Sequence, residues 1–271
     1  MIYSLQSVSK SFPERRGAVQ ALNGLTLAIR PGEMLALLGQ SGAGKTTLFR
    51  VLNATLRPTT GAVVFDGVNT LSLTGSGLRA MRRRVGTIYQ QHNLVPSLTA
   101  LENVLCGALG RMSVLATLRA IFRPAKTDMD EALHALELVG LAEKRNARAD
   151  ELSGGQQQRL AVARVLMQSP DVILADEPTA SLDPALAETI TSLLVGLARD
   201  GKRSLIMAVH RVDLALQHFP RAVGLRAGGL CFDVPSSEVR ADLLSTLYSR
   251  GSKPIGESDG EHFQHKLGCA R

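Results

Sequence analysis

The sequence has few cysteines and no long apolar run. Its three cysteines, Cys106, Cys231 and Cys269, are odd in number and far apart, which argues against a disulfide framework or a paired-cysteine zinc site and predicts a reducing compartment, the cytoplasm. No apolar stretch reaches the roughly 18 residues that a membrane-spanning helix requires, and residues 1–10 lack a basic segment followed by an apolar one. We therefore expect a chain that is neither exported nor embedded in a membrane by itself.

The composition shows no repeat and no bias toward disorder. The 271 residues are 45% hydrophobic and 20% charged, which is ordinary for a globular domain with its own core. The formal net charge of +7 suits a nucleic acid, an anionic membrane, a phosphorylated ligand or simply a solvated basic surface, so charge alone selects no partner. Residues 251–271 are polar and without periodicity, and we expect a flexible tail there.

Short apolar segments that end at turns or polar motifs predict a mixed α/β fold. The expected strands are residues 25–30, 33–39, 62–67, 83–91, 171–176 and 203–210. Residues 46–56 have helical spacing, and Asp183 followed by Pro184 predicts the start of another helix.

Residues 99–168 have a different character and are predicted to be nearly all helical. Thr99 and Thr127 are expected helix starts, and the apolar residues that share one helical face are Met129, Leu133, Leu136 and Val139. We therefore place a helical subdomain at residues 91–166, inserted into an α/β core of residues 1–90 and 167–250 within a single domain.

A glycine-rich stretch after the second expected strand predicts a phosphate-binding loop. The stretch fits the pattern G-x-x-x-x-G-K-[ST] through Gly39, Gly44, Lys45 and Thr46. An apolar strand precedes it and a helix follows it, which makes a flexible Gly/Ser turn with a surface lysine an improbable alternative. Lys45 would reach the terminal phosphates, and the Thr46 hydroxyl would bind Mg²⁺. The loop comprises Gly39, Gln40, Ser41, Gly42, Ala43, Gly44, Lys45, Thr46 and Thr47.

The stretch VILADEP supplies the acidic residues that such a loop needs. Residues 172–175 predict a buried parallel strand, so Asp176 emerges at the sheet edge where nucleotides bind in open α/β folds. We assign Asp176 to the metal and Glu177 to the water that attacks a γ-phosphate. Without the strand and the loop, Glu177 would be interpreted as a solvated loop carboxylate.

A second glycine-rich stretch, LSGGQQQR at residues 152–159, has two compatible interpretations. Ser153 and Gln156 form a capping box before the helix that follows. Ser153, Gly154 and Gly155 also form a helix start whose exposed N–H groups can bind an anion. Since the first loop already surrounds phosphates from one side, this second site would complete the pocket of another copy of the chain.

In this order, GQSGAGKTT, LSGGQQQR and VILADEPTASLD resemble the Walker A, signature and Walker B/D-loop motifs of ATP-binding cassette (ABC) ATPases, over about residues 1–251. The resemblance implies a RecA-like P-loop core with an antiparallel β subdomain and an inserted α-helical signature subdomain. It also implies ATP and Mg²⁺ as ligands. Finally, it implies a head-to-tail homodimer in which each of two ATP molecules lies between the Walker A loop of one subunit and the signature of the other.

The resemblance implies roles for further residues. Gln90, or the adjacent Gln91, matches the Q-loop glutamine that senses Mg²⁺ and the membrane partner, and His210 matches the switch histidine that contacts the γ-phosphate. Asp183 matches the D-loop aspartate, although a helix cap explains it equally well. Phe12 matches the aromatic residue that stacks on adenine, with a core or loop position as the alternative.

Within this family the sequence is similar to the separate ATPase subunits of bacterial importers, and LTALENVLCGALGR followed by the signature region is similar to those for phosphonate and phosphite. The resemblance implies a peripheral protein at the cytoplasmic face of the inner membrane, with permease subunits as direct partners and an extracytoplasmic solute-binding protein as an indirect one. The alternatives are another solute, an exporter and, more remotely, a DNA-associated ATPase. The last should carry a long coiled coil between the motifs, so no nucleic acid is expected.

Overall fold

The computed structural model describes residues 1–14, 17–90, 93–112, 124–180 and 182–249, so the expected tail and Gln91 lie outside the described residues. The strands are β1 (Tyr3–Glu14), β2 (Gly17–Ile29), β3 (Met34–Leu38), β4 (Thr60–Phe65), β5 (Val68–Asn69), β6 (Val85–Ile88), β7 (Val172–Ala175), β8 (Ser204–Ala208), β9 (Arg221–Arg226) and β10 (Gly229–Pro235). The α-helices are α1 (Lys45–Leu52), α2 (Gly75–Arg84), α3 (Ala100–Leu105), α5 (Lys126–Leu138), α6 (Gly154–Gln168), α7 (Pro184–Asp200), α8 (Val212–His218) and α9 (Ala241–Tyr248). Short 3-10 turns are η1 (Thr70–Ser72), η2 (Cys106–Arg111), η3 (Ala142–Lys144), η4 (Ala149–Glu151) and η5 (Ser236–Glu238).

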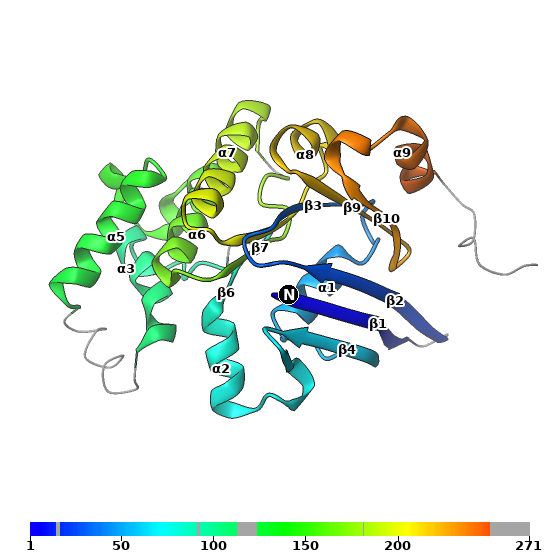
Figure 1. Ribbon diagram of the computed structural model, residues 1–271. Coiled ribbons are helices and arrows are strands. Elements are labelled where there is room, and N and C mark those ends of the chain that lie inside the picture. Colours follow the sequence, from blue (N-terminus) through cyan, green and yellow to red (C-terminus); the bar gives the residue numbers. More distant parts are fainter. Residues whose placement is uncertain (15–16, 91–92, 113–123, 181, 250–271) are drawn as a thin grey trace, which may run out of the picture.

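Two sheets organise the fold. One is antiparallel with the order β2-β1-β4-β5, and the other has the order β10-β9-β3-β8-β7-β6, in which β9, β3, β8, β7 and β6 run parallel. Alternate residues of β3 separate the two cores, because Leu35 and Leu37 face α1 and the antiparallel sheet while Ala36 and Leu38 face the other side. Helix α1 therefore lies between the sheets (Figure 1). Among the described residues, no helix has the length and apolar character of a membrane span.

Helices α3, α5 and α6 gather at one end of the molecule, beyond the edge strand β6 (Figure 1). The capping box predicted at Thr99 is confirmed, since its hydroxyl accepts from the Glu102 N–H and Glu102 accepts from the Thr99 N–H. The helix start predicted at Thr127 is wrong by one residue. Helix α5 begins at Lys126, and no side chain caps it. Of its expected apolar face, Leu136 and Val139 are buried, whereas Met129 and Leu133 are only partly buried. The subdomain boundaries at residues 91 and 166 stay a prediction.

The helix expected over residues 46–56 is shorter than its apolar spacing suggests. Helix α1 ends at Leu52, and Ala54 has a left-handed φ of 54° that a continuing helix cannot accommodate. The Asn53 side chain accepts hydrogen bonds from the N–H and hydroxyl of Thr55, which fixes the turn. A local side-chain turn therefore overrides the apolar pattern.

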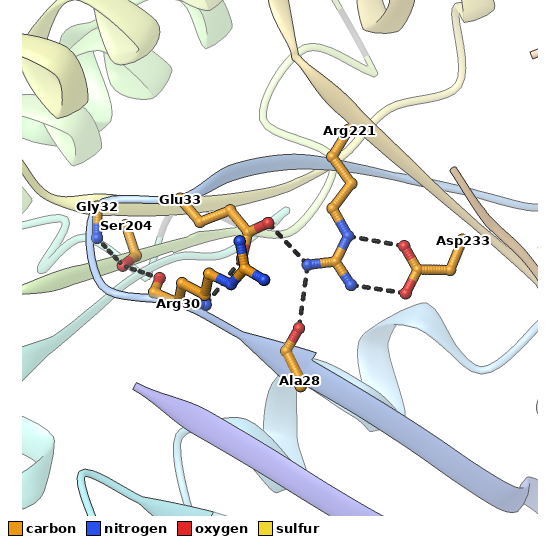
Figure 2. A network of polar contacts seen from close by, with 7 residues as sticks. All are labelled: Ala28, Arg30, Gly32, Glu33, Ser204, Arg221 and Asp233. Atoms are coloured by element: carbon orange, nitrogen blue, oxygen red, sulfur yellow. Dashed lines mark hydrogen bonds and ion pairs between the residues drawn. The ribbon is translucent and has the colours of Figure 1, made fainter. Parts of the chain in front are cut away.

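Arg221 joins the two sheets (Figure 2). Its Nε and Nη2 atoms each lie 2.6 Å from an oxygen of Asp233 on β10, and Nη1 lies 2.8 Å from Oε1 of Glu33, just before β3. The same Nη1 donates to the Ala28 carbonyl on β2 at 3.0 Å. Since β2 belongs to the antiparallel sheet, one guanidinium bonds to both sheets.

Replacing Arg221 with Met is expected to destabilise the fold by about 1–3 kcal/mol, because two carboxylates and a carbonyl lose their partner at a site where the side chain is only 20% exposed. The free energy of unfolding in urea measures this. The exposed Arg199, changed to Met in the same way, is the control and should shift stability by less than about 0.5 kcal/mol. Equal stability of the two variants would show that Arg221 does not hold the sheets together.

Candidate active site

The polar residues singled out from the sequence follow the carboxyl ends of four neighbouring parallel strands. Strand β3 leads to Lys45, β8 to His210, β7 to Asp176 and Glu177, and β6 to Gln90. These strands are adjacent in the order β3-β8-β7-β6. Their carboxyl ends therefore bring five predicted residues to one edge of the sheet.

The loop between β3 and α1 has a backbone that only glycine adopts easily. Gly42 and Gly44 have φ values of 82° and 102°. A Cβ at Gly39 would lie 2.5 Å from the Leu225 carbonyl oxygen, and one at Gly44 would lie 2.4 Å from that of Ala21. The loop is thus packed closely against β9 and β2, so a side chain at Gly39 or Gly44 would not fit.

The remaining loop residues differ in exposure. Ser41 and Thr46 are exposed, Thr47 is partly buried and Ala43 is buried. The Gln40 side-chain amide donates to the carbonyl of Tyr248, the last residue of α9, at 2.8 Å. This contact gave no signal in the sequence, because the two residues are far apart along the chain.

Lys45 holds the centre of the site. Its buried Nζ donates to the carbonyls of Gly39 at 2.8 Å and Gln40 at 3.1 Å, and lies 3.2 Å from Oε1 of Glu177. The other oxygen of Glu177, Oε2, lies 2.7 Å from Nε2 of His210. Lysine, glutamate and histidine thus form one continuous polar chain at the mouth of the phosphate loop.

The backbone turns Glu177 toward this chain. Its φ of 52° is left-handed, a conformation that costs a non-glycine residue about 1 kcal/mol or more. Burial alone would raise the pKa of the Glu177 carboxyl, but hydrogen bonds from His210 and Lys45 outweigh it and hold the pKa below its usual range. The carboxylate is therefore ionised at neutral pH.

Asp176 has the properties of a metal ligand. Its side chain is buried, and its Oδ1 atom has no hydrogen-bond partner within the described part of the chain. Burial raises the pKa of Asp176, and a hydrogen bond from Thr46 opposes the shift. A hard cation satisfies both a buried carboxylate and a neighbouring hydroxyl, so the two residues fit Mg²⁺.

Phe12 and Gln90 are the other residues assigned from the sequence. Phe12 lies on β1 opposite Val19 and is partly buried, and its role beside adenine stays a prediction. Lys10 Nζ lies 5.2 Å from the ring centroid. Gln90 is exposed in the turn after β6, and the choice between it and Gln91 stays open because Gln91 lies outside the described residues.

The second glycine-rich stretch begins α6. Its predicted capping box is confirmed, because the Ser153 hydroxyl accepts from the Gln156 N–H at 3.4 Å and Gln156 Oε1 accepts from the Ser153 N–H at 2.9 Å. Ser153 and Gly154 are exposed, and a Cβ at Gly154 would meet nothing within 4 Å. Gly155 packs against Leu186. No hydrogen bond or ion pair in the described ranges joins this stretch to the phosphate loop, which leaves it accessible to another molecule.

Asp183 confirms its expected role as a helix cap, since Oδ1 accepts from the N–H groups of Ala185 and Leu186 at 3.1 and 3.0 Å. The side chain is otherwise exposed, so a second role at a dimer interface stays a prediction.

Arg164 on α6 is a residue that the motifs did not reveal. Its Nη1 donates to the Asn93 carbonyl at 2.5 Å, in the chain that follows Gln90. Burial lowers the pKa of Arg164. Its own backbone is tightly packed, because a Cβ at Gly107 would lie 2.2 Å from the Arg164 carbonyl oxygen. The sequence signal that could have identified Arg164 is its position on a largely apolar face of α6.

The ABC transporter family profile matches residues 22–180, more than half of the chain. The chain belongs to the ABC transporter family. It is therefore an ABC ATPase, the predicted fold class and ATP binding are confirmed, and the assignment of catalytic roles to single residues stays a prediction.

Relatives of this ABC ATPase include the phosphonates import ATP-binding protein PhnC of Alcaligenes faecalis, 44% identical over 84% of this chain and 82% of that protein. PhnC 3 of Halalkalibacterium halodurans is 39% identical over 94% and 98% of the two chains. A solved dimeric ATP-binding cassette in a post-hydrolysis state, bound to ADP and Pi, is 32% identical with a TM-score of 0.76 and covers 86% of this chain and 98% of that one.

Proposed function

We propose that this ABC ATPase energises the import of phosphonates, and of phosphite as a closely related solute. The observation that carries the proposal is the identity of 44% to a phosphonates import ATP-binding protein over more than four fifths of both chains. Nothing in the phosphate loop or the signature stretch distinguishes one transported solute from another, so the solute rests on this similarity. Another solute or export is the second candidate.

The site supports hydrolysis by in-line attack of water. The phosphate loop and Lys45 would hold the phosphates, and Asp176 with Thr46 would hold Mg²⁺, which when bound neutralises phosphate charge. Glu177 would accept the proton of the attacking water. His210, at 2.7 Å from Glu177, would orient that carboxylate and reach the γ-phosphate.

A homodimer would complete this site. The exposed Ser153 and Gly154, together with the partly buried Gly155, would bind the ATP held by the phosphate loop of a second copy, as the head-to-tail arrangement of the family implies. Support comes from the open space around Gly154 and from the dimeric state of the solved relative. Phe12 would stack on adenine, since the β1–β2 hairpin that carries it also supplies Ala21, against which Gly44 packs.

Permease subunits at the cytoplasmic face of the membrane would be the direct partners, and an extracytoplasmic solute-binding protein the indirect one. Gln90 would connect the nucleotide with the permease, because it follows the strand beside β7 and is exposed. ATP-driven closure of the dimer would then move the permease halves.

Reconstitution with a phosphonate permease and its solute-binding protein from the same organism tests the proposal. ATP turnover is expected to rise with methylphosphonate or phosphite and to stay at its basal rate with phosphate, sulfate or amino acids. The binding protein without solute is the control. Stimulation by an amino acid alone would overturn the solute, and turnover that ignores the permease would overturn transport.

A further inference from the structure

Most of the net charge of the protein lies in one short segment. Residues 45–90 contain seven Lys and Arg side chains and a single carboxylate, Asp66, in a chain whose total formal charge is +7. Lys45 is buried in the active site, and Arg84 is paired with Asp66 at 2.8 Å and with Asp171 at 2.5 Å. The remaining five are exposed and form what we call the basic face: Arg50, Arg57, Arg79, Arg82 and Arg83.

A hydrogen bond from one of these arginines connects α2 with the end of α1. The Arg82 guanidinium on α2 donates to the Ala54 carbonyl, just past the end of α1, at 2.8 Å. Helix α2 projects from the outer edge of the fold below β6 (Figure 1). The buried Asn53 amide beside Ala54 also lies 3.3 Å from the Tyr89 hydroxyl, so the end of α1 contacts the residue before Gln90.

The helix dipoles favour Arg50 in the last turn of α1 and Arg82 and Arg83 in the last turn of α2, but they do not account for Arg57 or Arg79. No carboxylate within the described ranges forms an ion pair with Arg50, Arg57, Arg79 or Arg83. Arg79, Arg82 and Arg83 are three and four positions apart on one helix, where like charges repel. An anion brought to this face would remove that repulsion.

Exposed apolar residues precede α2 in the chain. Val68 and Leu71, which lie in β5 and η1 just before α2, keep 46% and 37% of their surface exposed. Basic side chains next to exposed aliphatic ones are typical of surfaces that rest on anionic bilayers. A soluble acidic peptide would not require the apolar part.

We propose that the basic face binds the anionic phospholipid headgroups of the membrane at which the importer works, which rests on the proposed function. The arginines would contact headgroup phosphates, and Val68 and Leu71 would enter the boundary between headgroups and acyl chains. This contact would hold α2 against the membrane independently of the permease.

Sedimentation of the full chain with vesicles tests the contact. Binding is expected to phosphatidylcholine vesicles that contain phosphatidylglycerol, not to phosphatidylcholine alone, and should weaken as salt is raised. Each arginine near an anionic surface changes affinity about fivefold, so Arg79→Gln with Arg83→Gln should lower binding on the order of 25-fold. Neither side chain has a hydrogen bond or ion pair with the described part of the chain, and basal ATP turnover should not change.

The matched control is Arg199→Gln with Arg240→Gln, two exposed arginines on α7 and next to α9, which remove the same charge. It should leave vesicle binding within about twofold. Equal loss in both double variants, or no binding to phosphatidylglycerol vesicles, would overturn the proposal. So would normal vesicle binding of Arg79→Gln/Arg83→Gln combined with lost stimulation by the permease, which would assign the basic face to acidic permease loops. The vesicles contain neither permease nor solute, so this outcome is independent of which solute is imported.

Discussion

A chain carrying Glu177→Gln is expected to bind ATP normally and to hydrolyse it at least about 100-fold more slowly. The amide cannot accept the proton of the attacking water. Lys45 keeps its hydrogen bonds to the Gly39 and Gln40 carbonyls, so the phosphate loop should retain its shape. Because hydrolysis then no longer opens the dimer, ATP should accumulate in a stable dimeric complex.

Single-turnover hydrolysis, equilibrium ATP binding and size-exclusion chromatography with ATP measure the three parts of this expectation. Glu143→Gln, an exposed carboxylate in η3, is the control and should behave as the unmodified chain. Near-normal turnover of the Glu177→Gln chain would assign the base to another residue, even though His210 and Lys45 both contact Glu177.

Ser153→Arg is expected to abolish cooperative hydrolysis while sparing ATP binding by the single subunit. The arginine would fill the open helix start that a second copy needs, whereas no described contact connects Ser153 with the phosphate loop of its own chain. Some stability is lost as well, since the cap of α6 is worth about 1 kcal/mol. Ser153→Thr keeps both the hydroxyl and the cap and should retain activity.

Mixing distinguishes a shared site from a damaged subunit. A Ser153→Arg chain has an intact phosphate loop, and a Lys45→Ala chain has an intact signature stretch, so their heterodimer contains one complete site. Activity should appear in the mixture and in neither variant alone. An inactive mixture, with heterodimers demonstrated by a tag on each chain, would contradict the shared site.

Much of the site follows from which strand each motif succeeds. The buried runs before Lys45, Asp176 and His210 predict parallel strands, and the carboxyl ends of parallel strands meet at one edge. The helix caps at Thr99, Ser153 and Asp183 could also be predicted from the sequence, because each cap depends on residues within three positions.

The sequence does not predict which side chains pair with each other at the carboxyl edge of the parallel sheet. Lys45 could have turned to Asp176, and its ion pair with Glu177 depends on a left-handed backbone that no local pattern encodes. The contacts of Gln40 with α9 and of Arg221 with β2 join distant segments, which periodicity does not report. The end of α1 was missed because a side-chain turn at Asn53 outweighs helical spacing.

The hydrogen bond from Arg164 to Asn93 ties α6 to the chain that follows Gln90. The helix has 15 residues and is about 22 Å long, with Ser153 at its start and Arg164 in its second half. It also packs against α3 and α5. A displacement of the chain beside residue 93 would therefore be transmitted through α6 to the helical subdomain and to the exposed start of the helix at Ser153.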